Sequence, residues 1–302
     1  MIVTVTPNPA LDVSYRVDRL VHGSAHRVRS VRERAGGKGF NVSRVLHERG
    51  VGTLAVGPVG GVLGESLRAD LVASGVPHAL LEVAAPTRMT VAVVDDEDAT
   101  LFNEAGAALP DTEWDRLLDL VRSRLAGARA AVCSGSLPRG APPDLCARVV
   151  AVARGAGVPV VVDTSGPALL AAARAGADVV KPNAAELREV VAADDPVAGA
   201  EVLRAMGARA VVLSLGPDGL VAVTEEGRWR AAPPFPVRGN PTGAGDAAVA
   251  ALANGLVERS PWPARLRAAV AWSAAAVAVP VAGSVDAALA RDLHDGVVVE
   301  PV

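Results

Sequence analysis

Short runs of valine, alanine and leucine alternate with longer amphipathic stretches through most of the second half of the chain. From about residue 128, buried strands are predicted within 128–136, 158–166, 177–183 and 208–216. Helices are predicted between them, within 142–157, 167–176 and 184–193. Uninterrupted apolar strands that alternate with helices are typical of βαβ units, whose parallel sheet is covered by helices on both faces. The pattern therefore predicts an α/β fold.

Each predicted strand ends in polar residues, which read "SGS", "DTSG", "KPN" and "SLG". The carboxyl ends of parallel strands meet at one edge of a sheet, where ligands usually bind. We therefore expect the functional site at that edge.

The first third of the chain has a different pattern. Residues 11–20 alternate apolar and polar positions, the period of a strand with one wet face. Residues 87–106 predict two strands joined by an acidic turn at 95–98. We expect these pieces to form a small lid sheet, from segments of about 11–35 and 86–105, inserted in one domain spanning 1–302. Between them, 36–50 predicts a glycine turn that leads into an amphipathic helix.

Composition and charge narrow the function classes. Half of the residues are hydrophobic and 21% are charged, as in an ordinary globular protein. The net charge of −3 argues against a nucleic-acid or anionic membrane surface.

Cys133 and Cys146 lack metal-ligand spacing, so we expect buried thiols. The chain begins directly on a strand pattern, which predicts a cytoplasmic protein, and the uncharged stretch 268–285 is interrupted by Pro280, which favours a buried helix over a membrane span.

The stretch "GNPTGAGDAAVAAL", residues 239–252, joins a glycine-rich turn to an alanine-rich helix. Backbone N–H groups at a helix start favour an anion, which makes Gly243, Ala244 and Gly245 candidate phosphate ligands. Asp246 then has the place of a base that accepts a proton during phosphoryl transfer. The dinucleotide fingerprint G-x-G-x-x-A also fits, but the proline-rich segment before it is not the strand that this fingerprint requires. A helix start in which Asp246 only complements the dipole remains the alternative.

Two further segments carry groups suited to a phosphorylated or hydroxyl-rich ligand. In "AGGKGFNVSRV", Gly37 allows close backbone approach, while Lys38 adds positive charge and Asn41 adds an amide. The alternative is a glycine turn with a solvated lysine. Asp12 could accept hydrogen bonds from sugar hydroxyls, and Arg88 could fork onto a phosphate.

The segment "KPNAAE" places Asn183 and Glu186 three residues apart at a predicted helix start. An N-cap role explains Asn183 without any ligand. Near a nucleotide, Glu186 could hold Mg²⁺ through water, because this ion keeps much of its hydration shell. "SLGPDG", residues 214–219, could pass under nucleotide phosphates or be an ordinary turn.

The order of these motifs is more specific than any one of them. "NPALD", "GGKGFNVSRVL", "SGSLP", "VDTSG", "KPN", "SLGPDG" and "PTGAGDA" follow one another along nearly the whole chain. In this the chain closely resembles the PfkB family of ribokinase-like sugar kinases, in particular the branch with 1-phosphofructokinase and tagatose-6-phosphate kinase. The resemblance implies a three-layer, Rossmann-like α/β/α core with a β-sheet lid, and transfer of the ATP γ-phosphoryl group to a phosphosugar hydroxyl with Mg²⁺ present. It also implies a homodimer formed through the lid.

Position by position, the resemblance assigns Asp246 as the catalytic base and Gly243, Ala244 and Gly245 as the anion hole. It assigns the sugar or its phosphate to Asp12, Gly37, Lys38, Asn41, Arg88 and Ser136, with Arg27 as a further phosphate candidate. It assigns ATP and its metal to Lys181, Asn183, Glu186, Ser214, Gly216 and Gly219.

The resemblance also bears on the substrate. Lys38 matches the 1-phosphofructokinase and tagatose-6-phosphate types, whereas fructose-6-phosphate-using relatives often carry glycine there. Two departures from the family pattern are Ala247–Ala248 after the motif aspartate and Thr90 where an asparagine is common. The expected substrate is fructose 1-phosphate or tagatose 6-phosphate. The alternatives are a 6-phosphofructokinase, a free-sugar kinase and a non-catalytic sensor on the same fold.

Overall fold

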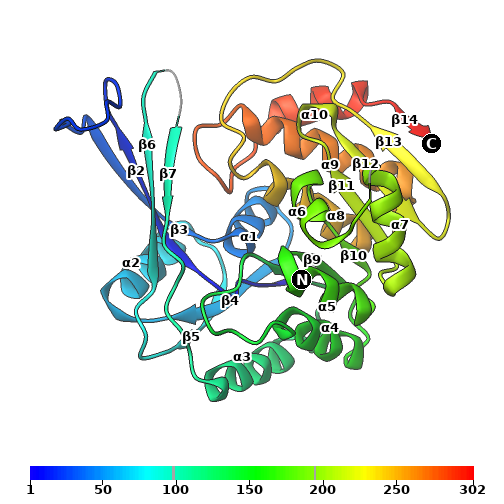
Figure 1. Ribbon diagram of the computed structural model, residues 1–302, viewed down its shortest axis with the longest axis horizontal. Helices are drawn as coiled ribbons and strands as arrows, with labels where there is room; N and C mark the ends of the chain where they lie inside the picture. The colour runs from blue at the N-terminus through cyan, green and yellow to red at the C-terminus, as the bar shows by residue number, and fades with distance from the viewer. Residues whose placement is uncertain (97–98, 194) are drawn as a thin grey trace.

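The computed structural model describes residues 1–96, 99–193 and 195–302. Its main sheet has ten strands in the order β14-β13-β12-β11-β10-β9-β8-β1-β4-β5 (Figure 1). These are β1 Ile2–Val5, β4 Thr53–Val59, β5 His78–Glu82, β8 Ala130–Ser134, β9 Val160–Asp163, β10 Val179–Val180, β11 Ala210–Ser214, β12 Leu220–Thr224, β13 Arg228–Ala231 and β14 Val299–Pro301. The seven strands that lie between β11 and β5 in this order, both included, are parallel to one another. Strands β12, β13 and β14 add an antiparallel edge.

Helices cover both faces of this sheet (Figure 1). They are α1 Lys38–Glu48, α2 Gly61–Ala73, α3 Asp111–Arg124, α4 Leu145–Gly155, α5 Gly166–Arg174, α6 Ala184–Val190, α7 Pro196–Met206, α8 Ala244–Glu258, α9 Trp262–Val277 and α10 Ala287–Gly296. The sheet contributes alternate residues to the two cores: Val3 and Val5 of β1 pack with α3 to α5 and α7, whereas Ile2 packs with α1 and α8 to α10. The predicted three-layer α/β/α core is confirmed.

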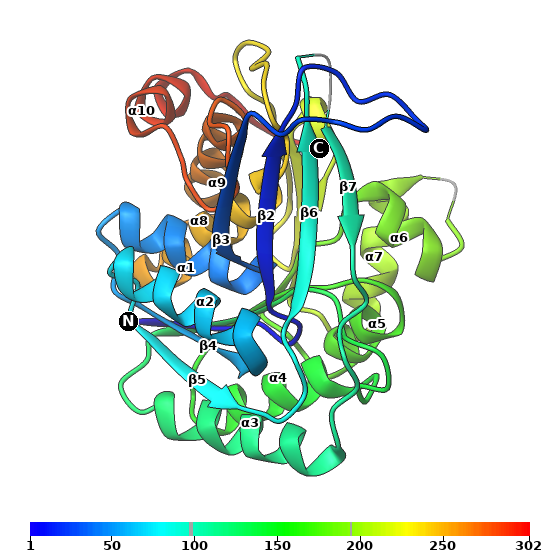
Figure 2. The same ribbon diagram turned by 90° about the vertical axis from the view of Figure 1, so that its left-hand side faces the viewer.

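A second sheet of four strands, in the order β3-β2-β6-β7, stands beside the core (Figure 2). We call it the lid; its strands are β2 Ala10–Arg16, β3 Ser30–Gly36, β6 Arg88–Val94 and β7 Ala99–Asn103. The alternating pattern of the first third therefore predicted the lid correctly. Positions 97 and 98 of the expected acidic turn lie outside the described residues. The homodimer through the lid stays a prediction.

Two smaller expectations concern buried segments. Most of the uncharged stretch from residue 268 lies in α9, whose inner face is buried against α8. Within the described ranges, no helix has both the length and the apolarity needed to cross a bilayer. Cys133 and Cys146 are free, fully buried thiols with their sulfurs 3.5 Å apart.

Candidate active site

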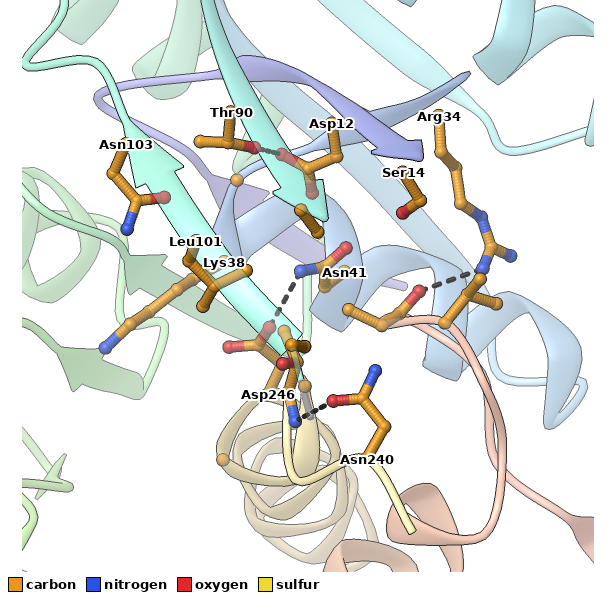
Figure 3. Close-up of a pocket in the computed structure, with 18 of the residues that line it drawn as sticks. Asp12, Ser14, Arg34, Lys38, Asn41, Thr90, Leu101, Asn103, Asn240 and Asp246 are labelled. Atoms are coloured by element: carbon orange, nitrogen blue, oxygen red, sulfur yellow. Dashed lines mark hydrogen bonds between the residues drawn. The ribbon is translucent and has the colours of Figure 1, made fainter. Parts of the chain in front are cut away.

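A cavity of about 760 Å³ lies between the lid and the carboxyl ends of the core strands. It gathers most of the residues that the sequence motifs nominated, from both ends of the chain (Figure 3). They are Asp12, Gly37, Lys38, Asn41, Arg88, Lys181, Asn183, Glu186, Ser214, Gly243, Gly245 and Asp246. Three of the four polar strand ends thus line this cavity, through Asp163, Lys181 with Asn183, and Ser214.

The start of helix α8 forms one wall of this cavity. Its N-cap, Gly243, has a φ of 88°, a left-handed conformation that favours glycine. Within the described residues, the N–H groups of Gly243 and Gly245 have no hydrogen-bond partner, as an anion site requires. Ala244 differs from the expectation, because its N–H donates to the carbonyl of Pro241 at 3.1 Å. The turn that positions the glycines uses this donor internally.

Asp246 lies in the first turn of α8, where it is only 5% exposed. Asn41 donates a hydrogen bond from Nδ2 to its Oδ2 at 2.8 Å (Figure 3). Burial raises the pKa of Asp246 to about 7, although Lys38 lowers it. This carboxyl group can therefore gain or lose a proton near neutral pH, as a general base must. The amide of Asn41 thus holds this carboxylate and also lines the cavity, so its expected role as a sugar ligand stays a prediction.

Lys38, Lys181 and Asp163 form a charge cluster next to Asp246. Asp163 is 1% exposed and lies 3.3 Å from the Nζ atoms of both lysines. Burial alone would raise the pKa of Asp163, but Lys181 and Lys38 together hold it below its ordinary value. Lys38 also approaches Glu186 Oε1 at 3.6 Å, and its pKa is raised, mainly by Asp163. The ammonium of Lys38 thus lies among the carboxylates at the strand ends.

Asn183 and Glu186 form a capping box at the start of α6. The side chain of Asn183 accepts from the N–H of Glu186, and Glu186 Oε2 accepts from the N–H of Asn183, both at 2.8 Å. This is the structural role that the sequence left open for Asn183. Glu186 also lines the cavity, with its Oε1 outside the capping box, and the described residues contain no ready-made cluster of three metal ligands. A single carboxylate oxygen of this kind fits Mg²⁺, which keeps most of its water ligands.

The lid supplies the opposite wall. Thr90 donates a hydrogen bond to the carboxylate of Asp12, and burial raises the pKa of Asp12 above its ordinary value. A Cβ at Gly36, on the facing strand, would collide with this carboxylate. Arg88 donates to the carbonyls of Asn8, at 3.2 and 3.3 Å, and of Glu104, at 2.9 Å. Thr90, which departs from the common family residue, therefore orients Asp12.

Other nominated residues lie outside this cavity. Ser136 and Arg27 are exposed and do not line it. Gly219 has a φ of 86° and is packed against the carbonyl of Ala231. The conformation of the turn and this close contact therefore account for a glycine at this position without a ligand. Gly216, with a φ of 63°, begins the 3₁₀ turn η1 (Gly216–Asp218) and faces a neighbouring surface depression.

Asp163 and Arg34 line the cavity, although neither was predicted as a site residue. Asp163 was part of the strand-end motif "DTSG", and its place at the predicted crevice was a usable signal. Arg34 lies in the lid and contacts residues about 250 positions later in the chain. Nothing in the local sequence indicates that contact.

A model of the pfkB family of carbohydrate kinases matches residues 8–287. The chain belongs to this family. Phosphofructokinase-2 from Escherichia coli, in a potassium complex, superposes with a TM-score of 0.91 at 30% identity, over 97% of this chain and 98% of that one. A possible 1-phosphofructokinase from Thermotoga maritima gives a TM-score of 0.90 at 26% identity, over 100% and 99% of the two chains.

Arabidopsis thaliana ribokinase shows the same fold at 23% identity, with a TM-score of 0.76 over 97% of this chain and 98% of that one. The resemblance read from the motifs is thus confirmed at the level of family and fold. The protein is a carbohydrate kinase with a ribokinase-like core and a lid sheet.

Proposed function

We propose that this kinase uses ATP and Mg²⁺ to phosphorylate a hydroxyl group of a ketohexose phosphate, giving the bisphosphate. The supporting observation is the buried carboxylate of Asp246 next to the free N–H groups that begin α8. Phosphoryl transfer needs a proton acceptor on the attacking hydroxyl and donors around the transferred group. One helix end supplies both.

The two walls of the cavity then have separate roles. Asp12, with Gly37 and Arg88, binds the sugar phosphate from the lid side. Gly243 and Gly245 donate to the phosphoryl group in transit, and Asp246 takes the proton of the sugar hydroxyl. A bound Mg²⁺, held through water by Glu186, would supply positive charge to the nucleotide phosphates.

Lys38 and Lys181 are proposed to face the nucleotide phosphates. Both ammonium groups approach Asp163 on this side of the cavity, and an ideal Cβ at Gly245 would lie 3.6 Å from Lys181 Nζ. Asn183, Ser214, Gly216 and Gly219 would lie along ATP. Ser136 is also a proposed phosphate ligand. Because it does not line the cavity, it would have to move toward the cavity to bind the phosphate.

A substrate panel tests this proposal. ATP turnover is measured with fructose 1-phosphate, tagatose 6-phosphate, fructose 6-phosphate and free fructose. We expect the highest kcat/KM with one of the first two sugars. Escherichia coli phosphofructokinase-2 has been crystallised with fructose 6-phosphate, so this sugar is the main alternative. Highest turnover with free fructose would overturn the phosphosugar class.

The pKa of Asp246 predicts the pH dependence. Because only the carboxylate can accept the hydroxyl proton, the rate at low concentrations of both substrates should rise through about pH 7 and then level off. The profile is measured between about pH 5 and pH 9 in buffers of constant ionic strength. A flat profile across this range would exclude Asp246 as the titrating base.

A further inference from the structure

One lid side chain reaches the opposite wall of the cavity. Arg34 lies on β3, directly across from Asp12 on β2. Its Nη1 donates to the carbonyl of Ala282 at 2.9 Å (Figure 3). Its Nη2 donates to Ser284 Oγ at 3.1 Å. Glu48 completes the contact, because its Oε1 lies 3.6 Å from Arg34 Nη2 and accepts from Ser284 Oγ at 2.8 Å. The side chain thus spans from the lid to the segment between α9 and α10.

That segment, residues 280–284, packs directly on the turn that carries the anion site. An ideal Cβ at Gly243 would lie only 2.9 Å from the Cα of Ala282, so the two backbones are in close contact. Asn240, in the same turn, donates from Nδ2 to the carbonyl of Pro280 at 3.2 Å. Whatever moves the 280–284 segment must therefore also move the 239–246 turn.

The segment also touches the residue that holds the catalytic carboxylate. An ideal Cβ at Gly283 would lie 3.1 Å from Oδ1 of Asn41, whose Nδ2 donates to Asp246. The lid strand with Arg34, the anion site and the base are therefore linked by one chain of packed atoms.

We propose that Arg34 is a positioning residue that couples closure of the lid on the sugar to the geometry of the 239–246 turn. The proposal rests on the proposed function, in which the lid binds the sugar and the turn binds the transferred phosphoryl group. Lid closure then favours the arrangement that binds the nucleotide, and each ligand raises the affinity of the other by the same factor.

The chemistry of the contact suits this role. The Arg34 side chain is 23% exposed, and burial lowers its pKa from an ordinary value that lies far above neutrality. Hydrogen bonds from a charged guanidinium are about twice as strong as neutral ones, and the planar group can hold two acceptors at once. Methionine at this position would keep the length but lose both bonds.

The test measures coupling between the two ligands. Binding of a non-hydrolysable ATP analogue with Mg²⁺ is titrated with and without saturating hexose phosphate. We expect the sugar to tighten the analogue by about 5-fold or more in the wild type. In Arg34→Met the factor should fall close to one, with kcat lowered by about 10- to 100-fold, and Arg34→Lys should restore part of both.

Arg32→Met is the matched control. Arg32 lies two residues away on the same strand and lines the same cavity, yet its side chain makes no hydrogen bond or ion pair with any described residue. Its loss removes the same charge and should leave the coupling factor unchanged. Coupling retained in Arg34→Met, or lost equally in both variants, would overturn the proposal, as would a wild type without coupling.

Hydrogen exchange in the ligand-free protein separates this inference from the proposed function. The N–H of Asn240 donates to the carbonyl of Val277 at 2.9 Å, and that of Ala244 to Pro241, so both amides report on the turn. They should exchange faster in Arg34→Met than in Arg32→Met. Unchanged exchange would refute the link even for an active kinase. Absence of any hexose-phosphate turnover, with faster exchange, would refute the substrate class alone.

Discussion

Replacing Asp246 by asparagine is expected to lower kcat by about 10²- to 10⁴-fold, the usual contribution of a positioned general base. Asparagine keeps the size of the side chain and can still meet the amide of Asn41, but it cannot accept the hydroxyl proton. The binding of ATP and of the sugar phosphate should therefore stay within a few-fold of the wild type. Steady-state kinetics together with calorimetric binding of each ligand would separate the two effects.

Stability provides the control for folding. Because the folded-state pKa of Asp246 is raised, its protonated form is favoured by the fold, and the wild type loses stability as pH rises through about 7. The asparagine variant lacks this titration, so above neutral pH its free energy of unfolding should equal or exceed that of the wild type. A near-normal kcat in this variant would rule out the base role, and the alternative in which Asp246 only complements the helix dipole would then hold.

The fold was largely predictable because its signals are local. The Val-rich strands from β8 to β11 carry apolar side chains to both faces, so their pattern differs plainly from the one-sided lid strand β2. The antiparallel edge from β12 to β14 was not foreseen. Its outermost strand, β14, comes from the C-terminal end of the chain and meets residues 229–231 only in the folded protein.

Site residues could be predicted where they belong to a short sequence motif. Asp246 and the glycines before it could be placed from the sequence because a helix start defines where their groups point. Lys38 was expected at the sugar, and that role stays a prediction; the contact of its ammonium with Asp163, more than a hundred residues later, could not be read from the motif. Ala244 was assigned as a donor without account of the tight turn that uses its N–H. In both cases the partner of the group is chosen by packing, which the motif does not specify.

Asp163 is the missed residue with the largest expected effect. Replacing it by asparagine removes the charge that Lys38 and Lys181 share, and leaves the almost fully buried Lys181 without its counter-charge. Breaking a buried pair in this way typically costs about 3–5 kcal/mol of unfolding free energy. We also expect kcat to fall on the order of 10²-fold, because both ammonium groups lose the anchor that aims them at the phosphates. Chemical denaturation and steady-state kinetics would measure the two losses.

The pH profile distinguishes an electrostatic role from simple damage to the fold. The negative charge of Asp163 helps to raise the pKa of Asp246, so the acidic limb of the rate profile should move to lower pH in Asp163→Asn. Asp178→Asn is the matched control: this carboxylate accepts from the N–H of Val160, pairs with the exposed Arg209 and does not line the cavity. Loss of the Asp178 charge should change neither kcat nor the pH at which the acidic limb of the rate profile lies. An unshifted limb in Asp163→Asn, with kcat reduced, would mean that Asp163 supports the fold without tuning the base.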